Sequence, residues 1–240
     1  KKLITLSLIL SLSLRACAQW GKRVNGNGNV VSVERNVGNY DAIALAGWFD
    51  VELVDGNEGE ITLKGESNLL EYVKTEVKDG RLVIKVEKGV NLKPSNWNSG
   101  IFVTVPVESI NAVTLSGSGD IEGKTTLKSD NFKTRISGSG DISLDIEAET
   151  LEVSLSGSGN IDLDGKATDL DINVSGSGDI AAYGLNADYV TATVSGSADV
   201  NVTANESIKA KVSGSGDISY RGNPKKIDTK SSGSGDISRG

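Results

Sequence analysis

The sequence predicts an all-β protein with one short helix, built as a right-handed parallel β-helix with coils of about 19 residues and a mixed N-terminal cap. The first observation is a repeated hexapeptide, Ser-Gly-Ser-Gly-Asp-Ile, which returns every 18 to 21 residues. Its seven copies begin at Ser116, Ser137, Ser156, Ser175, Ser195, Ser213 and Ser232. The third copy has Asn160 in place of Asp, and the fifth has Ala198 and Val200 in place of Gly and Ile. Such spacing is typical of repeat proteins in which each unit buries its apolar face against the next.

The second observation is the alternation of apolar and polar residues between the copies. In one unit, Ile142, Leu144 and Ile146 alternate with polar residues, and the same pattern returns over residues 151–155. Alternation with period two is typical of half-buried strands. The pattern therefore predicts that each unit within residues 111–240 contains two strands joined by two turns.

The third observation, the near-identity of the turns, decides how the units are arranged. An antiparallel meander with a separate hairpin at each copy also fits the alternation. Stacked turns share one backbone path and need glycine at the same place, whereas separate hairpins are free to differ. We therefore expect coils, with the right-handed crossover that is usual between parallel strands.

Residues 30–110 are expected to form the cap and a degenerate first coil. The segment 43–53 aligns with residues 113–121 and has Trp48 and Phe49 where the copies have Ser and Gly. Terminal repeats are often atypical because one of their faces meets solvent or a cap. Strands are expected over 60–64, 81–87 and 101–105, with a loop over 88–100.

A single helix is expected to begin at Asn68 and to run to about Lys74 or Val77. Asn68 and Glu71 have the spacing of a capping box, in which the first side chain accepts an amide three residues on and the second reaches back.

The lead Asp41-Ala42-Ile43, the segment 47–51 and the helix at 68–73 are followed by the reiterated hexapeptide. Together they resemble the bacterial family named "putative auto-transporter adhesin, head GIN domain", over about residues 30–237. The resemblance implies an exported envelope protein of a kind common in Bacteroidetes, with a role in adhesion. The family has no established activity, so the resemblance carries over no catalytic residue.

Residues 1–18 are predicted to be an export signal, because a basic start precedes an apolar stretch that is too short to span a bilayer. Two cleavage sites compete. Residues 14–17 resemble a lipobox, from which Arg15 departs and in which Cys17 would be lipidated. Residues 16–18 form an A-x-A site. Either site predicts export to the periplasm, outer membrane or cell surface, with a linker over 19–29.

Composition excludes several kinds of chemistry. The chain has no His and one Cys, so a Ser-His-Asp triad, a Cys-His pair and a His-ligated zinc site cannot form. The formal net charge of −7 argues against nucleic acid as a partner. We expect no cofactor.

Coiling would place the acidic residue of each copy in one column. Its members are Asp120, Asp141, Asn160, Asp179, Asp199, Asp217 and Asp236. We expect a structural role, in which each side chain accepts backbone amides from its own Ser-Gly-Ser-Gly turn. The alternative is Ca²⁺ shared between levels, because the G-x-G-x-D order is similar to calcium-binding β-roll repeats, although those have nine-residue units. We otherwise expect no metal.

The leading functional prediction is a non-enzymatic envelope scaffold or adhesin that binds a protein or a glycan. Trp48, Phe49 and Trp97 are a candidate ligand platform, although aromatics near the end of a solenoid more often belong to its cap or core. The alternative is a carbohydrate-active enzyme that uses carboxylates on the solenoid face. Membrane contact is expected only through a lipid anchor, and oligomers only through the open C-terminal edge.

Residues that depart from the repeat mark where a catalytic site would differ from the scaffold. They are Tyr183, Tyr189, Tyr220, Arg221, Lys225 and Lys226. We expect these to be surface side chains on turn insertions, with the two lysines and Pro224 protecting the edge against strand addition.

Overall fold

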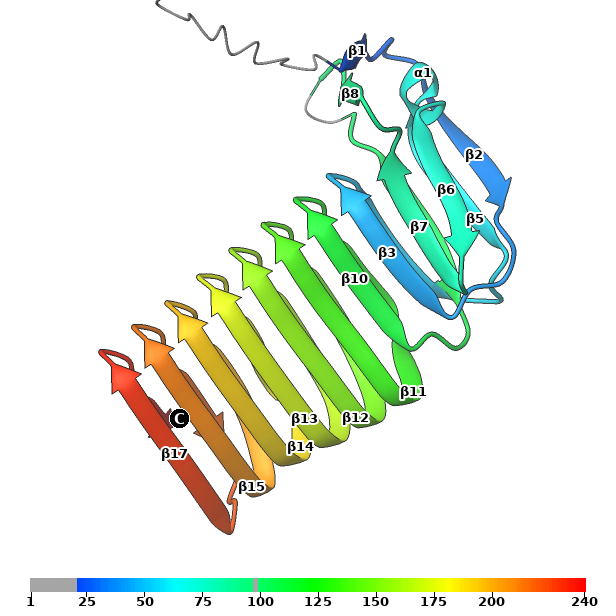
Figure 1. Ribbon diagram of the computed structural model, residues 1–240. Helices are drawn as coiled ribbons and strands as arrows, with labels where there is room; N and C mark the ends of the chain where they lie inside the picture. Colours follow the sequence, from blue (N-terminus) through cyan, green and yellow to red (C-terminus); the bar gives the residue numbers. More distant parts are fainter. Residues whose placement is uncertain (1–20, 97–98) are drawn as a thin grey trace, which may run out of the picture.

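The computed structural model describes residues 21–96 and 99–240. The predicted export signal, Cys17 and Trp97 lie outside the described residues. The described chain is almost entirely β-strand, and it contains one helix of four residues. The predicted parallel β-solenoid is confirmed, because equivalent residues of successive coils pair in register at a spacing of about 19 residues, as Leu151 does with Leu170. Figure 1 shows these coils as a regular stack.

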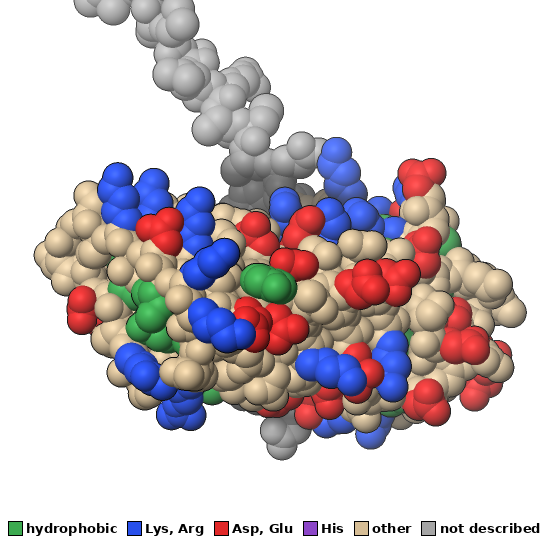
Figure 2. All heavy atoms as spheres, turned by 90° about the horizontal axis from the view of Figure 1, so that it is seen from below, with side chains coloured by type: hydrophobic (Ala, Val, Ile, Leu, Met, Phe, Trp, Pro, Cys, Tyr) green, Lys and Arg blue, Asp and Glu red, His purple; other side chains and the backbone are tan. Residues whose placement is uncertain are grey.

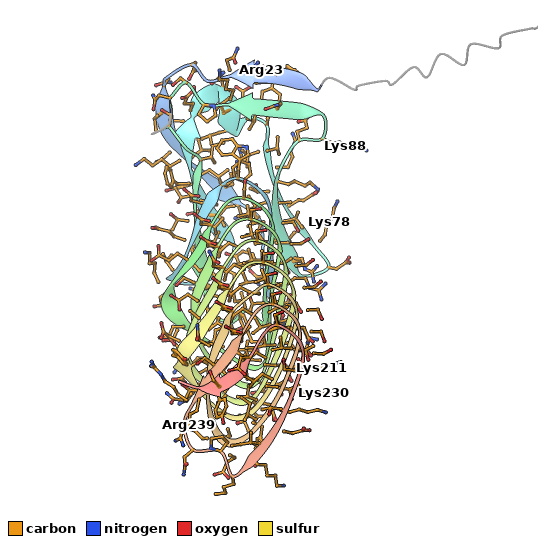
Figure 3. All side chains as sticks on the ribbon, turned by 90° about the vertical axis from the view of Figure 1, so that its left-hand side faces the viewer. Arg23, Lys78, Lys88, Lys211, Lys230 and Arg239 are labelled. Atoms are coloured by element: carbon orange, nitrogen blue, oxygen red, sulfur yellow. The ribbon has the colours of Figure 1, made fainter. Side chains whose placement is uncertain are left out.

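Five long strands form the body of the solenoid. They are β11 (Ile121–Gly138), β12 (Ile142–Gly157), β13 (Ile161–Gly176), β14 (Ile180–Gly196) and β15 (Val200–Gly214). Each runs along one face, turns a corner and returns along the opposite face. The pairing shows this, because the start of β11 pairs with β4 (Asp50–Asp55), whereas its end pairs with β10 (Ala112–Gly117). Figure 3 looks along the stack and shows flattened, nested coils.

The N-terminal part extends both faces. On the face toward the viewer in Figure 1, β10 pairs with β3 (Ala42–Gly47) in the register of one further coil, with Gly117 beside Gly47. Then follow β7 (Arg81–Val86) and β6 (Val73–Lys78). On the other face, β4 is followed by β9 (Phe102–Val107), β5 (Glu60–Glu66) and β2 (Val30–Asn36). The last two pairings are antiparallel, so the coil pattern ends in a cap.

The C-terminal end is formed by β16 (Ile218–Arg221), β17 (Lys226–Gly233) and β18 (Ile237–Arg239). Every residue of β17 is exposed, and Ile227 is 54% exposed. Thr229 and Ser231 take the register positions at which β15 has buried Ala210 and Val212. The inward row therefore becomes polar where the stack meets solvent.

The expected helix is wrong in extent and in its cap. Helix α1 spans only Ser67–Leu70, and its N-cap residue makes no capping hydrogen bond through its side chain. Asn68 instead holds the preceding chain, because its Oδ1 accepts from the Asn27 amide at 3.1 Å and its Nδ2 donates to the Asn25 carbonyl at 2.8 Å. From Val73 onward, β-branched residues alternate and favour the strand β6.

Two segments expected to be irregular contain a pair of strands. β1 (Lys22–Asn25) lies within the expected linker, and β8 (Val90–Lys93) lies within the expected loop over 88–100. The two strands pair in parallel, and amides of residues 22 and 26 extend the pairing at both ends. Four-residue strands with few apolar residues carry too little alternation to be predicted, so their pairing is decided by the fold around them.

The core is one continuous cluster that runs from Tyr40 in the cap to Tyr220 in the last coils. Thr134 in β11 is an exception to its apolar composition. It is 1% exposed, lies in register between Val113 and Val153, and its Oγ1 has no hydrogen-bond partner. A buried hydroxyl without a partner lowers stability because it loses its bonds to water.

We predict that Thr134→Val raises the free energy of unfolding by about 1 kcal/mol, since it removes that hydroxyl at nearly constant shape. Urea denaturation measures the change. Thr203→Val is the matched control: Thr203 Oγ1 donates to the Tyr183 carbonyl at 2.8 Å, so this variant should lose stability. A loss of stability in both variants would contradict the prediction.

Candidate functional site

The Ser-Gly-Ser-Gly turns stack directly on one another. The first glycine carbonyl of one turn accepts the amide of the second serine in the next turn, at 2.8 Å for Ser139 to Gly117 and 2.9 Å for Ser158 to Gly138. The same bond returns between the later copies. The turns therefore form a hydrogen-bonded ridge along one side of the solenoid, visible as the row of loops in Figure 1.

Glycine is needed in these turns for two separate reasons. The first glycine of most copies has a positive φ, 143° at Gly157, which side chains rarely adopt. The second reason is space: a Cβ on Gly157 would lie 2.0 Å from the Gly138 carbonyl oxygen, and one on Gly159 would lie 1.9 Å from the Gly140 oxygen. The expectation that stacked turns require glycine in register is confirmed for the first glycine, which all seven copies keep. At the second glycine position the fifth copy has Ala198.

We predict that Gly157→Ala lowers the free energy of unfolding by about 3 kcal/mol or more, because both backbone strain and a backbone clash oppose the methyl group. Gly38→Ala separates the two effects. Gly38 also has a positive φ, 80°, but its Cβ would meet nothing within 4 Å, so only about 1 kcal/mol should be lost. Thermal or urea denaturation of both variants measures the difference, and equal losses would contradict the steric account.

The acidic column exists, and its hydrogen bonds run between coils. The Oδ1 of each member accepts the backbone amide of the next member, at 2.7–3.1 Å. The members are Asp120, Asp141, Asn160, Asp179, Asp199, Asp217 and Asp236. The side chains do accept backbone amides, as expected. The predicted donor was wrong, because the amide belongs to the next coil and not to the residue's own turn. The reason is that stacking brings that amide within reach of the carboxylate below it.

The column continues into the cap through Asp50. Burial and the nearby Asp120 carboxylate raise the pKa of Asp50, while a hydrogen bond with the Asp120 backbone opposes the rise. The Val51 amide also donates to the Asp120 carbonyl at 2.8 Å. The first coil thus joins the stack through the same contact.

Within residues 21–96 and 99–240, no three His, Cys, Asp or Glu side chains gather in the way that a metal site requires. Calcium on the acidic column stays an untested alternative. The column therefore defines a structural ladder whose Oδ1 atoms hold backbone amides.

A hollow lies beside Trp48, where the first coil departs from the repeat. Its volume is about 780 Å³, and its lining is largely apolar. The lining residues are Trp48, Leu92, Lys93, Pro94, Ser95, Asn96 and Gly100. We call this the Trp48 cavity. The residues expected to form one platform separate here: Trp48 lines the cavity, whereas Phe49 is fully buried with its ring centroid 5.3 Å from that of Trp48.

Glu66 fixes one wall of the Trp48 cavity. This buried carboxylate accepts from the Ser95 amide at 2.9 Å, from Ser95 Oγ at 2.5 Å and from the Gly28 amide at 3.3 Å. Burial acts to raise the pKa of Glu66, but these hydrogen bonds outweigh it and lower the pKa. A charged carboxylate thus ties the N-terminal segment and the 93–96 wall together.

We predict that the contribution of Glu66 to stability is complete above its ordinary pKa of about 4.3 and is lost as the pH falls toward its lowered folded pKa. Glu66→Gln should therefore be less stable than the wild type at pH 7, and the difference should narrow at pH 3. Urea denaturation at the two pH values tests this. Exposed Glu34→Gln is the control and should change little at either pH. A Glu66→Gln difference that is constant with pH would contradict the prediction.

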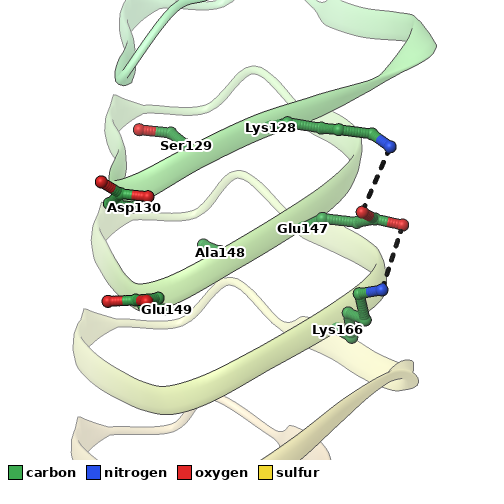
Figure 4. Close-up of a pocket in the computed structure, with 7 residues that line it drawn as sticks. All are labelled: Lys128, Ser129, Asp130, Glu147, Ala148, Glu149 and Lys166. Carbon is green, nitrogen blue, oxygen red and sulfur yellow. Dashed lines mark ion pairs between the residues drawn. The ribbon is translucent and has the colours of Figure 1, made fainter.

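A second hollow, of about 370 Å³, lies at the corner of the coils in Figure 4. Glu147 pairs there with Lys128 at 3.3 Å and with Lys166 at 3.5 Å. The side-chain hydrogen bond from Lys128 is the main cause of the lowered pKa of Glu147. Because these charges compensate one another across three coils, this corner is a stacking contact.

The departures near the C-terminus do not converge on a single point. Arg221 lies over the ring of Tyr183 at 3.8 Å, and Lys225 pairs with Glu206 at 2.7 Å. The expectation of surface side chains on turn insertions is wrong for Tyr220, which is buried within β16 and belongs to the core. Tyr183 and Tyr189 also lie within a strand, β14, and Tyr189 is 48% exposed. These side chains fill and cover the last coils.

Sequence reasoning missed Glu66, Ser95 and Leu92. The sequence indicated Trp48 because this residue breaks the repeat, and Trp48 does line the cavity. Its partners lie in the segments expected to be a loop and a helix start, where no repeat fixes the register. Among the described residues, no helix has the length and apolar character needed to cross a membrane.

These features define a repeat-built β-solenoid with a ligand-sized cavity at its capped end. The family described as "Putative auto-transporter adhesin, head GIN domain" matches residues 39–224. The protein belongs to this family, as the resemblance indicated. Among curated proteins, none matches the chain.

Solved structures share the fold. A "putative adhesin" from Bacteroides fragilis NCTC 9343 is 24% identical, with a TM-score of 0.85, over 90% of this chain and 99% of that one. A "putative lipid binding protein" from Parabacteroides distasonis ATCC 8503 is 27% identical, with a TM-score of 0.75, over 91% and 100%. A "putative adhesin" from Parabacteroides merdae ATCC 43184 is 23% identical, with a TM-score of 0.74, over 91% and 99%. Family and neighbours indicate an adhesin-like protein that is exported or on the surface.

Proposed function

We propose that this protein is a non-enzymatic adhesin of the bacterial envelope that binds a glycan or a protein through the Trp48 cavity. The observation that carries the proposal is the cavity itself, which lies where the otherwise uniform repeat is broken. Its volume of about 780 Å³ falls in the range of ligand pockets, which combine an apolar lining with a few polar groups. The apolar lining comes from Trp48, Leu92 and Pro94, and the polar groups come from Lys93 and Ser95.

The acidic ladder supports a structural role over the enzymatic alternative. A catalytic carboxylate needs an oxygen that is free to exchange a proton or attack substrate. Each Oδ1 that accepts the next coil's amide is engaged in stacking, and the arrangement repeats along the solenoid without distinct partners at one level. A catalytic centre would instead show convergent groups that differ from the repeat.

A lipid is the second candidate ligand. It is favoured by the largely apolar lining of the Trp48 cavity, together with the description of the Parabacteroides distasonis structure as lipid binding. An acyl chain would contact Trp48, Leu92 and Pro94, and Lys93 would pair with an anionic headgroup. A glycan or protein probe tests the first candidate and a lipid vesicle tests the second, so one experiment with all of these probes separates them.

The test is binding of the purified protein to a glycan array, to envelope proteins in a pull-down, and to phosphatidylglycerol vesicles. We expect saturable binding that is lost in Trp48→Ala and kept in Tyr189→Ala, a matched control at an exposed aromatic far along the stack. Vesicle binding alone, with the same loss in Trp48→Ala, would support the lipid candidate.

Two results would overturn the proposal. One is binding that Trp48→Ala and Tyr189→Ala leave equally strong, which would place the ligand elsewhere. The other is turnover of polysaccharides by the purified protein, which would support the enzymatic alternative. Circular dichroism of each variant confirms that the fold is retained.

A further inference from the structure

A separate hollow lies on the flat face of the solenoid, across β7, β3, β10, β11 and β12. These strands are adjacent in that order, as Figure 1 shows. Outward positions on β3 and β10 carry small side chains: Ala42 pairs with Ala112, and Ala44 pairs with Thr114. Long cationic side chains lie on β7 and β11. The hollow measures about 320 Å³ and is lined by Arg81, Ala112, Thr114, Lys133, Thr134, Arg135, Glu152 and Ser154.

Arg81 and Arg135 face this hollow without a counter-charge. Lys133 is paired with Glu152 at 2.9 Å, but neither arginine makes an ion pair or hydrogen bond within the described part of the chain. Both side chains are exposed. Two guanidinium groups on separate strands therefore remain free for a ligand that brings its own negative charge.

Cations gather at this hollow although the chain is acidic overall. The chain has a formal net charge of −7, and residues 141–205 hold twelve Asp and Glu but only Lys166 as a cation. The hollow lies at the start of this acidic region and takes in Glu152 and Ser154 from it. Another group of cations lies toward the C-terminal coils, at the left of Figure 2. Lys211 and Lys230 belong to that part of the chain and pair in register on the same face as the hollow.

We propose that this hollow binds an acidic oligosaccharide whose carboxylates contact Arg81 and Arg135. The inference rests on the proposed function and adds a second subsite with a defined ligand class. A guanidinium binds a carboxylate through two parallel hydrogen bonds. The hydroxyl of Thr114 lies on β10 between the arginines, and that of Ser154 lies on β12 beside Arg135; both can bind sugar hydroxyls.

The spacing of the two arginines favours an extended ligand over a single anion. Arg81 lies on β7 and Arg135 on β11, three strand spacings apart, which is about 14 Å at the backbone. A chain with acidic groups on successive units reaches both guanidinium groups at once. The small side chains between them leave a floor on which such a chain can lie.

The sheet itself favours a sugar over an acidic peptide. Peptides often bind sheets by adding a strand to a free edge, where main-chain groups supply much of the affinity. β7, β3, β10 and β11 each have a partner strand on both sides, so none offers an edge. Recognition on this face must come from side chains, which suits a ligand with many hydroxyls and a few carboxylates.

The experiment measures binding of trigalacturonate by isothermal titration calorimetry, with galactotriose as the neutral comparison. We expect the wild type to bind trigalacturonate and not galactotriose. Arg81→Gln and Arg135→Gln should each weaken binding about tenfold, since each removes a charge-assisted contact, and the double variant should abolish it. Affinity should also fall as salt is raised.

Lys230→Gln is the matched control, with the same loss of charge on the same face near the C-terminal end. It should bind trigalacturonate as the wild type does. Equal weakening in Lys230→Gln, equal binding of galactotriose, or no saturable binding of trigalacturonate would each overturn the proposal. Binding of penta-glutamate that the arginine variants abolish, without binding of trigalacturonate, would assign the hollow to an acidic peptide and would also overturn the proposal.

The outcomes also separate this inference from the proposed function. Binding of another glycan, lost in Trp48→Ala but unchanged in the arginine double variant, leaves the Trp48 cavity in place and removes only this subsite. Loss of trigalacturonate binding in Trp48→Ala alone would place the acidic ligand in the Trp48 cavity and overturn the assignment made here. Melting curves of all variants confirm equal folding.

Discussion

The approach of one turn to the next at strand spacing is the constraint on which this structure depends. A Cβ on the first glycine of a repeat would lie about 2 Å from a carbonyl oxygen of the preceding turn, as at Gly157. Glycine at this position leaves room for the serine amide to reach that carbonyl. This contact fixes the register of every coil, so the inward residues form continuous apolar rows and the acidic residues form a ladder. This one contact between turns therefore aligns both the buried apolar rows and the exposed acidic ladder.

Much of the solenoid was predictable because repetition supplies the register. Copies that share one spacing must present equivalent residues to each other, and Leu151 indeed lies beside Leu170. The cap was less predictable. Asn68 has the pattern of a helix cap but bonds to residues 25 and 27 instead, and β1 and β8 are strands only because they meet. Such contacts join distant segments that no period relates, so the sequence contains little signal for them.

The difference between the uniform repeat and the irregular cap also explains where the candidate sites lie. Within the repeat, a large side chain in the turn would block stacking, so the ridge stays uniform and its carboxylates stay engaged. At the first coil the preceding neighbour is the cap, and Trp48 and Phe49 are tolerated: one enters the core and the other lines a cavity. The hollow at Arg81 and Arg135 likewise depends on small residues of the first coils, whose neighbours differ from those of the repeat. Departures from the period could be found in the sequence, but the partners that complete each site needed the fold.

Amide hydrogen exchange of the ladder, followed by NMR, tests the stacking most directly. The backbone amides of Asp141, Asn160, Asp179, Asp199 and Asp217 lie at exposed residues, yet each donates to the side chain of the coil before it. The account predicts that these amides exchange slowly, like those inside the strands. Exchange as fast as in an unfolded chain would show that the turns do not stack in this register and would contradict the account.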